Sequence, residues 1–200
     1  MIYRRGFQHE HEDEHEDEHD HSGEDPHFFT DPARMAVAAG GIADFLVENV
    51  EGIDAESLRS SADSYIGDLE ALDAEVSDLL ADLSDDQRVL ITNHEVFAYF
   101  ADNYDFEIVG TVIPSGSTLD GTSAADLVEL VEVVEHEGVP AIFSDTSSSD
   151  ELVQTLADEV GDVAVVELFT ESLGDADSEG ATYVDMVRSN ATRIAEALAA

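Results

Sequence analysis

Short apolar segments alternate with amphipathic helical stretches through the C-terminal half of the chain, and this alternation limits the folds open to it. Strands are predicted at residues 89–92, 106–112, 141–143 and 163–168. Helices are predicted at residues 94–103, 123–137, 149–160 and 182–198. Strands that alternate with helices through short links predict a parallel sheet covered by helices on both faces.

Two long helical patterns precede the first strand. Asp31-Pro32 is a helix start, with Asp as the N-cap and Pro at the first helical position. Apolar residues then follow at helical spacing to Val50, and a second amphipathic pattern runs from about Ala55 to Leu83. The fold class predicted is therefore α/β, with a long helical spine followed by a four-stranded parallel sheet. We expect an acidic His-rich loop at residues 1–25, linker and backbone helices at 26–86, and an α/β lobe at 87–200.

The charge of the chain excludes several partners. Its 200 residues contain 48 Asp and Glu against seven Arg and no Lys, for a formal net charge of −41. Such a surface repels phosphate, which argues against nucleic acid and anionic membranes as partners, and it attracts cations. Residues 1–25 hold only ten of the acids. The acidity therefore belongs to the folded part and is typical of proteins from salt-adapted, halophilic cells, where salt screens the repulsion.

Other composition features exclude further classes. The chain has no Cys, so disulfides, thiolate metal ligands and a Cys nucleophile are ruled out. No apolar run approaches the roughly 18 to 20 residues of a membrane span, and the first residues lack the apolar region of a signal peptide. Nucleotide-binding glycine motifs and a nucleophile elbow are absent. Asn190-Ala-Thr192 matches a glycosylation sequon, but it falls inside a predicted helix.

Residues 8–25 form a low-complexity tract of His, Asp and Glu. Its histidines are His9, His11, His15, His19 and His21. The tract contains His-Glu-x-x-His twice, but metalloprotease chemistry needs a buried helix with an apolar face, and every neighbour here is acidic. An auxiliary metal-gathering loop and a solvated polar tail both fit this composition.

Three residues outside the tract could form a metal site. In a parallel sheet, ligands bind at the carboxyl ends of the strands, which favours segments 92–95, 113–117, 144–147 and 169–173. His94 follows the first strand and is predicted to open a helix, and Glu171 follows the fourth strand. His27 lies between two Asp-Pro pairs before the helical spine. Two imidazoles and a carboxylate suit Zn²⁺, with Mn²⁺ and Fe²⁺ as competitors, although each residue alone also fits a loop or capping role.

Four segments, in order, resemble one protein family. They are Asp-Pro-His-Phe-Phe-Thr-Asp-Pro (25–32), the helical stretch 65–75, Thr-Asn-His-Glu-Val-Phe-Ala-Tyr-Phe-Ala-Asp-Asn-Tyr (92–104), and residues 167–190 with Glu-Leu-Phe-Thr-Glu at their start. Together they resemble the zinc- and manganese-binding substrate-binding proteins of ABC importers, the ZnuA/TroA-like group called cluster A-1. The resemblance covers about residues 9–198.

The resemblance implies a fold and a function. It implies two α/β lobes joined by a long helix, with one metal ion held between them, and binding and delivery to a membrane permease and its ATPase without catalysis. His27, His94 and Glu171 fall on family ligand positions, the last of which is usually Asp. His at position 94 matches the zinc-selective branch, which favours Zn²⁺ over Mn²⁺.

The chain departs from the family pattern at its N-terminal side. Family members carry a first lobe ahead of the His-rich loop, and that lobe supplies a further His ligand. We therefore expect a fragment or truncated copy. Its full-length form would lie on the outer face of the cytoplasmic membrane as a lipoprotein or secreted protein. A low-affinity metal buffer, in which only the His-rich tract binds, is the first alternative, and a zinc hydrolase using the same three ligands is the second.

Overall fold

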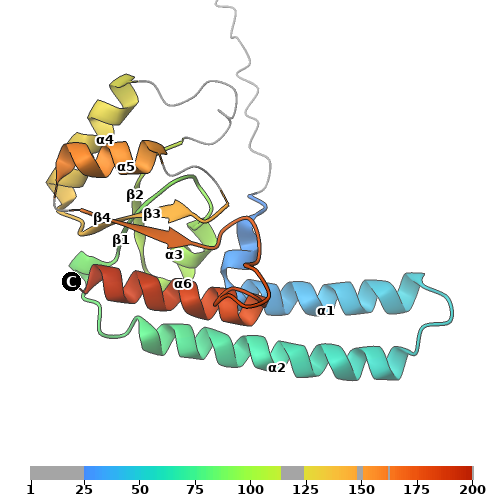
Figure 1. The fold of residues 1–200 in the computed structure, drawn as a ribbon. Helices are drawn as coiled ribbons and strands as arrows, with labels where there is room; N and C mark the ends of the chain where they lie inside the picture. The colour runs from blue at the N-terminus through green and yellow to red at the C-terminus, as the bar shows by residue number, and fades with distance from the viewer. Residues whose placement is uncertain (1–24, 114–123, 148–150, 162, 200) are drawn as a thin grey trace, which may run out of the picture.

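Four parallel strands form a single sheet in the order β2-β1-β3-β4 (Figure 1). The strands are β1 (Val89–Thr92), β2 (Glu107–Thr111), β3 (Ala141–Asp145) and β4 (Ala164–Leu168). The computed structural model describes residues 25–113, 124–147, 151–161 and 163–199. β3 and β4 pair along their whole lengths, from Ala141 opposite Ala164 to Asp145 opposite Leu168. β4 comes last in the strand order and is therefore an edge strand.

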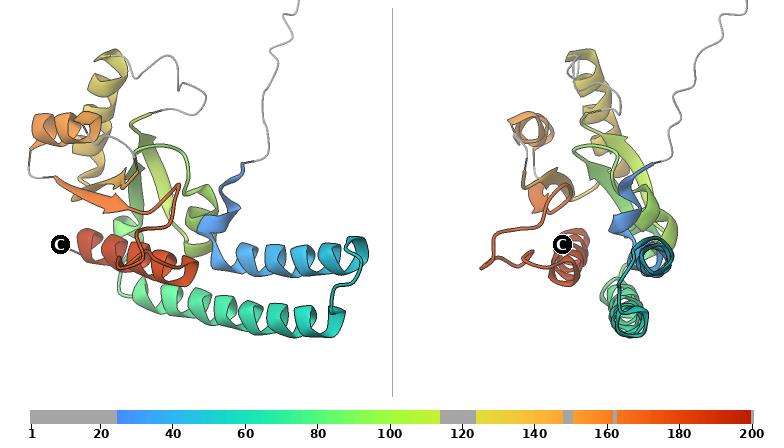
Figure 2. Two further views of the ribbon diagram at one scale, coloured as in Figure 1. Left: turned by 45° about the vertical axis from the view of Figure 1, so that its right-hand side comes forward. Right: turned by 90° about the vertical axis from the view of Figure 1, so that its right-hand side faces the viewer.

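Helices cover both faces of this sheet. α4 (Ala124–Glu137) and α5 (Glu151–Val160) pack on one face, around a core that includes Ile91, Ile142 and Leu156. α3 (Ala98–Tyr104) and α6 (Tyr183–Leu198) pack on the other face with the C-terminal half of the second long helix. Figure 2 shows these two helical layers on opposite sides of the strands. The predicted α/β class, parallel sheet and two-sided cover are confirmed.

The two long helices form an antiparallel pair that extends away from the sheet (Figure 1). α1 (Pro32–Asn49) begins where the Asp31 carboxylate accepts the backbone N–H groups of Ala33 and Arg34 at 2.8 and 3.4 Å. α2 (Ala55–Leu79) begins in the same way at Asp54, whose carboxylate accepts the Ser57 N–H at 3.1 Å. Side chains that accept these unpaired donors stabilise a helix start, so both helices begin where the sequence predicts.

Two element boundaries lie about four residues from those that the sequence predicts, and the others lie within two. α2 ends at Leu79, although Leu80 and Leu83 beyond it are buried in the core with α6. Leu80 and Leu83 lie in the turn that follows α2, and this turn packs against the same core. The apolar spacing in the sequence therefore continues past the end of the helix. His94 does not open a helix: it lies in a bend after β1, and α3 begins only at Ala98. The backbone carbonyl of His94 accepts the Thr92 hydroxyl at 2.9 Å and the Val96 N–H at 3.0 Å, which closes the bend.

Two short 3₁₀ turns complete the described elements. η1 (His27–Thr30) precedes α1, and η2 (Asp85–Gln87) precedes β1. No helix among the described residues combines the length and apolar character needed to cross a membrane. The His-rich tract up to residue 24, with all five of its histidines, lies outside the described residues.

Candidate metal centre

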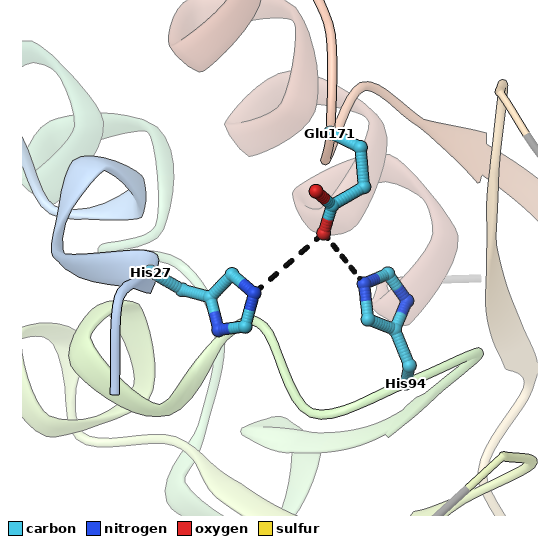
Figure 3. Close-up of side chains that lie close together, drawn as sticks. All are labelled: His27, His94 and Glu171. Carbon is cyan, nitrogen blue, oxygen red and sulfur yellow. Dashed lines mark hydrogen bonds and ion pairs between the residues drawn. The ribbon is translucent and has the colours of Figure 1, made fainter. Parts of the chain in front are cut away.

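His27, His94 and Glu171 come together at one point near the carboxyl ends of the strands (Figure 3). One ligand atom of each residue lies within 4.8 Å of the others. His27 Nε2 lies 3.6 Å from Glu171 Oε1, and His94 Nε2 lies 2.8 Å from the same oxygen. The two imidazole rings stand edge to face with centroids 6.1 Å apart. Three segments far apart in the sequence therefore direct an N,N,O ligand set at a common point.

His27 is oriented by Asp25, two residues earlier. The Asp25 carboxylate oxygen Oδ1 lies 2.6 Å from His27 Nδ1 and also accepts the His27 backbone N–H at 2.9 Å. Because a carboxylate only accepts, it holds the ring proton on Nδ1 and leaves the lone pair of Nε2 directed toward Glu171. A carboxylate behind a ligating imidazole is the usual arrangement in metal sites, since it fixes the tautomer and raises ligand basicity.

The segment that carries His27 is fastened to two other elements. The Tyr99 hydroxyl of α3 donates to the Asp25 carbonyl at 3.1 Å, and the Tyr183 hydroxyl of α6 donates to the Phe29 carbonyl at 2.8 Å. Burial raises the pKa of Tyr183 well above its ordinary value, so this hydroxyl keeps its proton and its donor role. The buried Thr30 hydroxyl donates to the His27 and Val96 carbonyls at 3.0 and 3.3 Å. The short turn η1 is thus held against α3, α6 and the bend after β1.

His94 and Glu171 meet across a single hydrogen bond. With Glu171 ionised, His94 Nε2 must carry the proton of this 2.8 Å contact. The His94 nitrogen that faces the site is therefore hydrogen-bonded to Glu171, whereas that of His27 lies farther from the same oxygen, at 3.6 Å. Binding a metal at all three residues requires the His94–Glu171 hydrogen bond to be exchanged for metal–ligand bonds.

The three side chains are partly accessible, which a site that loads and releases an ion requires. His27 is 21% exposed, His94 27% and Glu171 47%. Two imidazoles and one carboxylate form a three-residue set of the kind found in open zinc sites, with a coordination position left for water or another group. Imidazole favours Zn²⁺ and carboxylate accommodates Mn²⁺, so the donor set ranks zinc first without excluding manganese.

The structure brings together the three residues that the sequence singled out, but it also adds residues that the sequence did not assign. The strand-end rule placed His94 and Glu171, which follow β1 and β4. Asp25 and Tyr99 were not predicted, although the Asp-Pro pair before His27 was visible. Asn190, the possible glycan acceptor, is 6% exposed and its amide bonds to the Phe169 backbone, so it is not accessible for glycosylation.

Comparison with known proteins identifies the class to which this fold and site belong. Residues 3–197 match the family described as "Zinc-uptake complex component A periplasmic". The chain belongs to this family of metal-binding, ZnuA/TroA-like periplasmic proteins.

Several relatives carry names that bear on its role. The chain is 33% identical over 180 residues to the zinc-binding protein TroA of Treponema pallidum, an alignment that covers 88% of this chain and 58% of TroA. It is 27% identical over 168 residues to the manganese-binding lipoprotein MntA of Halalkalibacterium halodurans, covering 84% and 55%. It is 26% identical over 176 residues to the metal ABC transporter substrate-binding lipoprotein SsaB of Streptococcus sanguinis, covering 88% and 56%. The chain thus spans little more than half the length of these relatives.

A solved structure gives the same result for the fold. The periplasmic zinc-binding protein TroA from Treponema pallidum superimposes with a TM-score of 0.78 at 31% identity, covering 87% of this chain and 64% of that one. These relatives are named as metal-binding and transport proteins, not as enzymes, which supports the prediction that this chain is not a catalyst.

Proposed function

We propose that this chain captures a divalent metal ion, Zn²⁺ before Mn²⁺, and delivers it to the membrane permease of an ABC importer that works with its ATPase. The ion is held by His27, His94 and Glu171. The convergence of these three ligand atoms within 4.8 Å, from three separate segments, is the observation that carries the proposal. The names of the relatives supply the transport context.

The proposal extends to location and domain organisation. A protein that feeds an importer works outside the cytoplasmic membrane, and the relatives include lipoproteins. We assign residues 87–200 to the C-terminal lobe, residues 26–86 to the linker and backbone helices, and residues 1–25 to the His-rich loop, where His9, His11, His15, His19 and His21 form an auxiliary collecting region. The strongly acidic surface raises the local concentration of divalent cations around the site.

Calorimetric titration of the full chain with Zn²⁺ tests the ligand assignment. His94→Ala should abolish stoichiometric binding, and removal of residues 8–22 should leave it. His136→Ala is a matched control, because His136 is an exposed histidine near the end of α4 outside the three-residue group. If removal of the tract alone eliminated binding while His94→Ala did not, the chain would be a buffer that binds through the tract, and the ligand assignment would be wrong.

A further inference from the structure

Helix α6 contacts both the segment that carries His27 and the segment that carries Glu171. On α6, the Tyr183 hydroxyl donates to the carbonyl of Phe29, two residues after His27. Seven residues later, the side chain of Asn190 bonds to the backbone of Phe169, two residues before Glu171. Seven residues are close to two turns of an α-helix, so Tyr183 and Asn190 share one face of α6.

The Asn190 amide acts in place of a neighbouring strand. Its Oδ1 accepts the Phe169 N–H at 2.9 Å, and its Nδ2 donates to the Phe169 carbonyl at 2.7 Å, both in buried surroundings. β4 ends at Leu168 and pairs with β3 on one side only, so the outward backbone groups of Phe169 have no strand to pair with. The two bonds satisfy both groups and fix the direction in which the chain leaves the sheet. A buried backbone group without a hydrogen-bond partner lowers the stability of the fold, so these two bonds hold Phe169 firmly against α6. We call this pair of bonds the clamp between Asn190 and Phe169.

The Phe169 ring extends the same anchor into the loop that holds Glu171. A Cβ built on Gly180 or Gly174 would lie 2.8 or 2.9 Å from this ring, so both glycines allow the loop backbone to pass close against it. The loop closes on itself through the Gly174 N–H, which donates to the Gly180 carbonyl at 2.9 Å. The Arg193 guanidinium of α6 lies 5.0 Å from the ring centroid. Glu171 itself is about half exposed, so its position depends on these buried contacts and not on packing of its own side chain.

We infer that Asn190 and Tyr183 are positioning residues, and that α6 is the common support that sets the separation between His27 and Glu171. Neither residue belongs to the three-residue ligand group. Asn190 fixes the start of the Glu171 loop, and Tyr183 fixes the turn that carries His27. This inference rests on the proposed function, since it concerns the same three ligands.

Measurements of Zn²⁺ affinity show whether Asn190 and Tyr183 position the metal ligands or only stabilise the fold. In the full chain, Asn190→Ala should weaken Zn²⁺ binding at least about tenfold, the size usual for residues that orient metal ligands. Tyr183→Phe removes only the hydroxyl and should weaken binding by a smaller factor. The absorption spectrum of Co²⁺ bound in place of Zn²⁺ should change in both variants, because it reports ligand geometry. Leu156→Ala is the control: Leu156 is buried on the opposite face of the sheet and should lower the melting temperature while leaving affinity and spectrum unchanged.

The outcomes distinguish this inference from the proposed function. If Asn190→Ala and Tyr183→Phe behaved like Leu156→Ala, with lower stability but unchanged Zn²⁺ affinity and Co²⁺ spectrum, both residues would be merely structural and the inference would be overturned. If Asn190→Ala does not fold, Tyr183→Phe decides, because it keeps the ring and loses one hydrogen bond. Failure of the wild-type chain to bind Zn²⁺, or persistence of binding in His94→Ala, would instead contradict the proposed function.

Discussion

His94 Nε2 lies 2.8 Å from Glu171 Oε1, and the two residues are 77 positions apart in the sequence. The contact joins the bend after β1 to the loop after β4 and occupies the nitrogen of His94 that faces the metal site. His27 differs, because its other ring nitrogen, Nδ1, donates a hydrogen bond to the Asp25 carboxylate. These two contacts predict opposite tautomers for the two histidines of the site.

Nitrogen-15 NMR of the imidazoles tests this difference. The metal-free chain should show His27 protonated at Nδ1 and His94 protonated at Nε2. On addition of one equivalent of Zn²⁺, His94 should lose its Nε2 proton, whereas His27 should keep its Nδ1 proton because Asp25 still accepts it. Identical tautomers for the two rings before metal is added would contradict this account of the site.

Replacement of Asp25 should weaken metal binding without touching a ligand. Asp25→Ala removes the acceptor of both His27 N–H groups and should reduce Zn²⁺ affinity by about 10- to 100-fold. Asp25→Asn should have a smaller effect, because its amide oxygen can still accept both bonds without the negative charge. Asp102→Asn serves as the control, since Asp102 is an exposed acid that pairs with Arg34. Equal Zn²⁺ affinities for all three variants in calorimetry would show that Asp25 has no role in the metal site.

The negative charge of Glu171 should contribute more to Zn²⁺ affinity than the other negative charges of the same loop. Glu171→Gln keeps the shape of the side chain but loses the anionic ligand, and we expect Zn²⁺ affinity to fall by at least about tenfold, since even residues that only orient a ligand have effects of that size. Asp177→Asn makes the same charge change on an exposed residue of the same loop and should leave affinity nearly unchanged. A similar loss in the two variants would mean that the acidic field, and not coordination, holds the ion.

The ion pair between Glu75 and Arg188 should stabilise the contact between α2 and α6 in a pH-dependent way. Arg188 Nε and Nη2 lie 2.7 and 3.0 Å from the Glu75 carboxylate oxygens, and this hydrogen bonding lowers the pKa of Glu75 below its ordinary value of 4.5. The stabilisation is therefore complete above that ordinary value and is lost as the pH falls through the lowered one. Because both side chains are about 40% exposed, we expect only about 0.2–1 kcal/mol.

Urea unfolding of a double-mutant cycle, Glu75→Gln with Arg188→Gln, measures this coupling free energy directly. The coupling should be present at pH 7, decline in strong acid and decrease in high salt. A coupling that grew as the pH fell would give the wrong sign and contradict the assignment.

Much of the fold could be predicted because its signals are local. The caps at Asp31 and Asp54 and the apolar strand segments depend on neighbours in the sequence, and the structure begins these elements at the predicted residue or one residue later. The bend at His94 could not be predicted, because Thr92 and Val96 bond to its carbonyl instead of allowing the helix to start. Local periodicity does not report such competition between backbone partners.

The candidate site shows the same limit. The strand-end rule indicated His94 and Glu171, but His27 precedes every strand and is outside that rule. Its residue type made it a candidate ligand, and the resemblance to a family put it on a ligand position. The clamp between Asn190 and Phe169 depends on an edge strand whose outward groups need a partner, which is a property of the assembled sheet. The sequence around Asn190 suggested a glycosylation motif instead.

A crystal structure of the Zn²⁺-loaded chain, with anomalous data collected at the zinc absorption edge, tests the central claim most directly. The account predicts one strong anomalous peak about 2.0–2.2 Å from a ring nitrogen of His27, a ring nitrogen of His94 and a carboxylate oxygen of Glu171. A principal peak at the histidines of residues 9–21, with no peak between His27, His94 and Glu171, would contradict it.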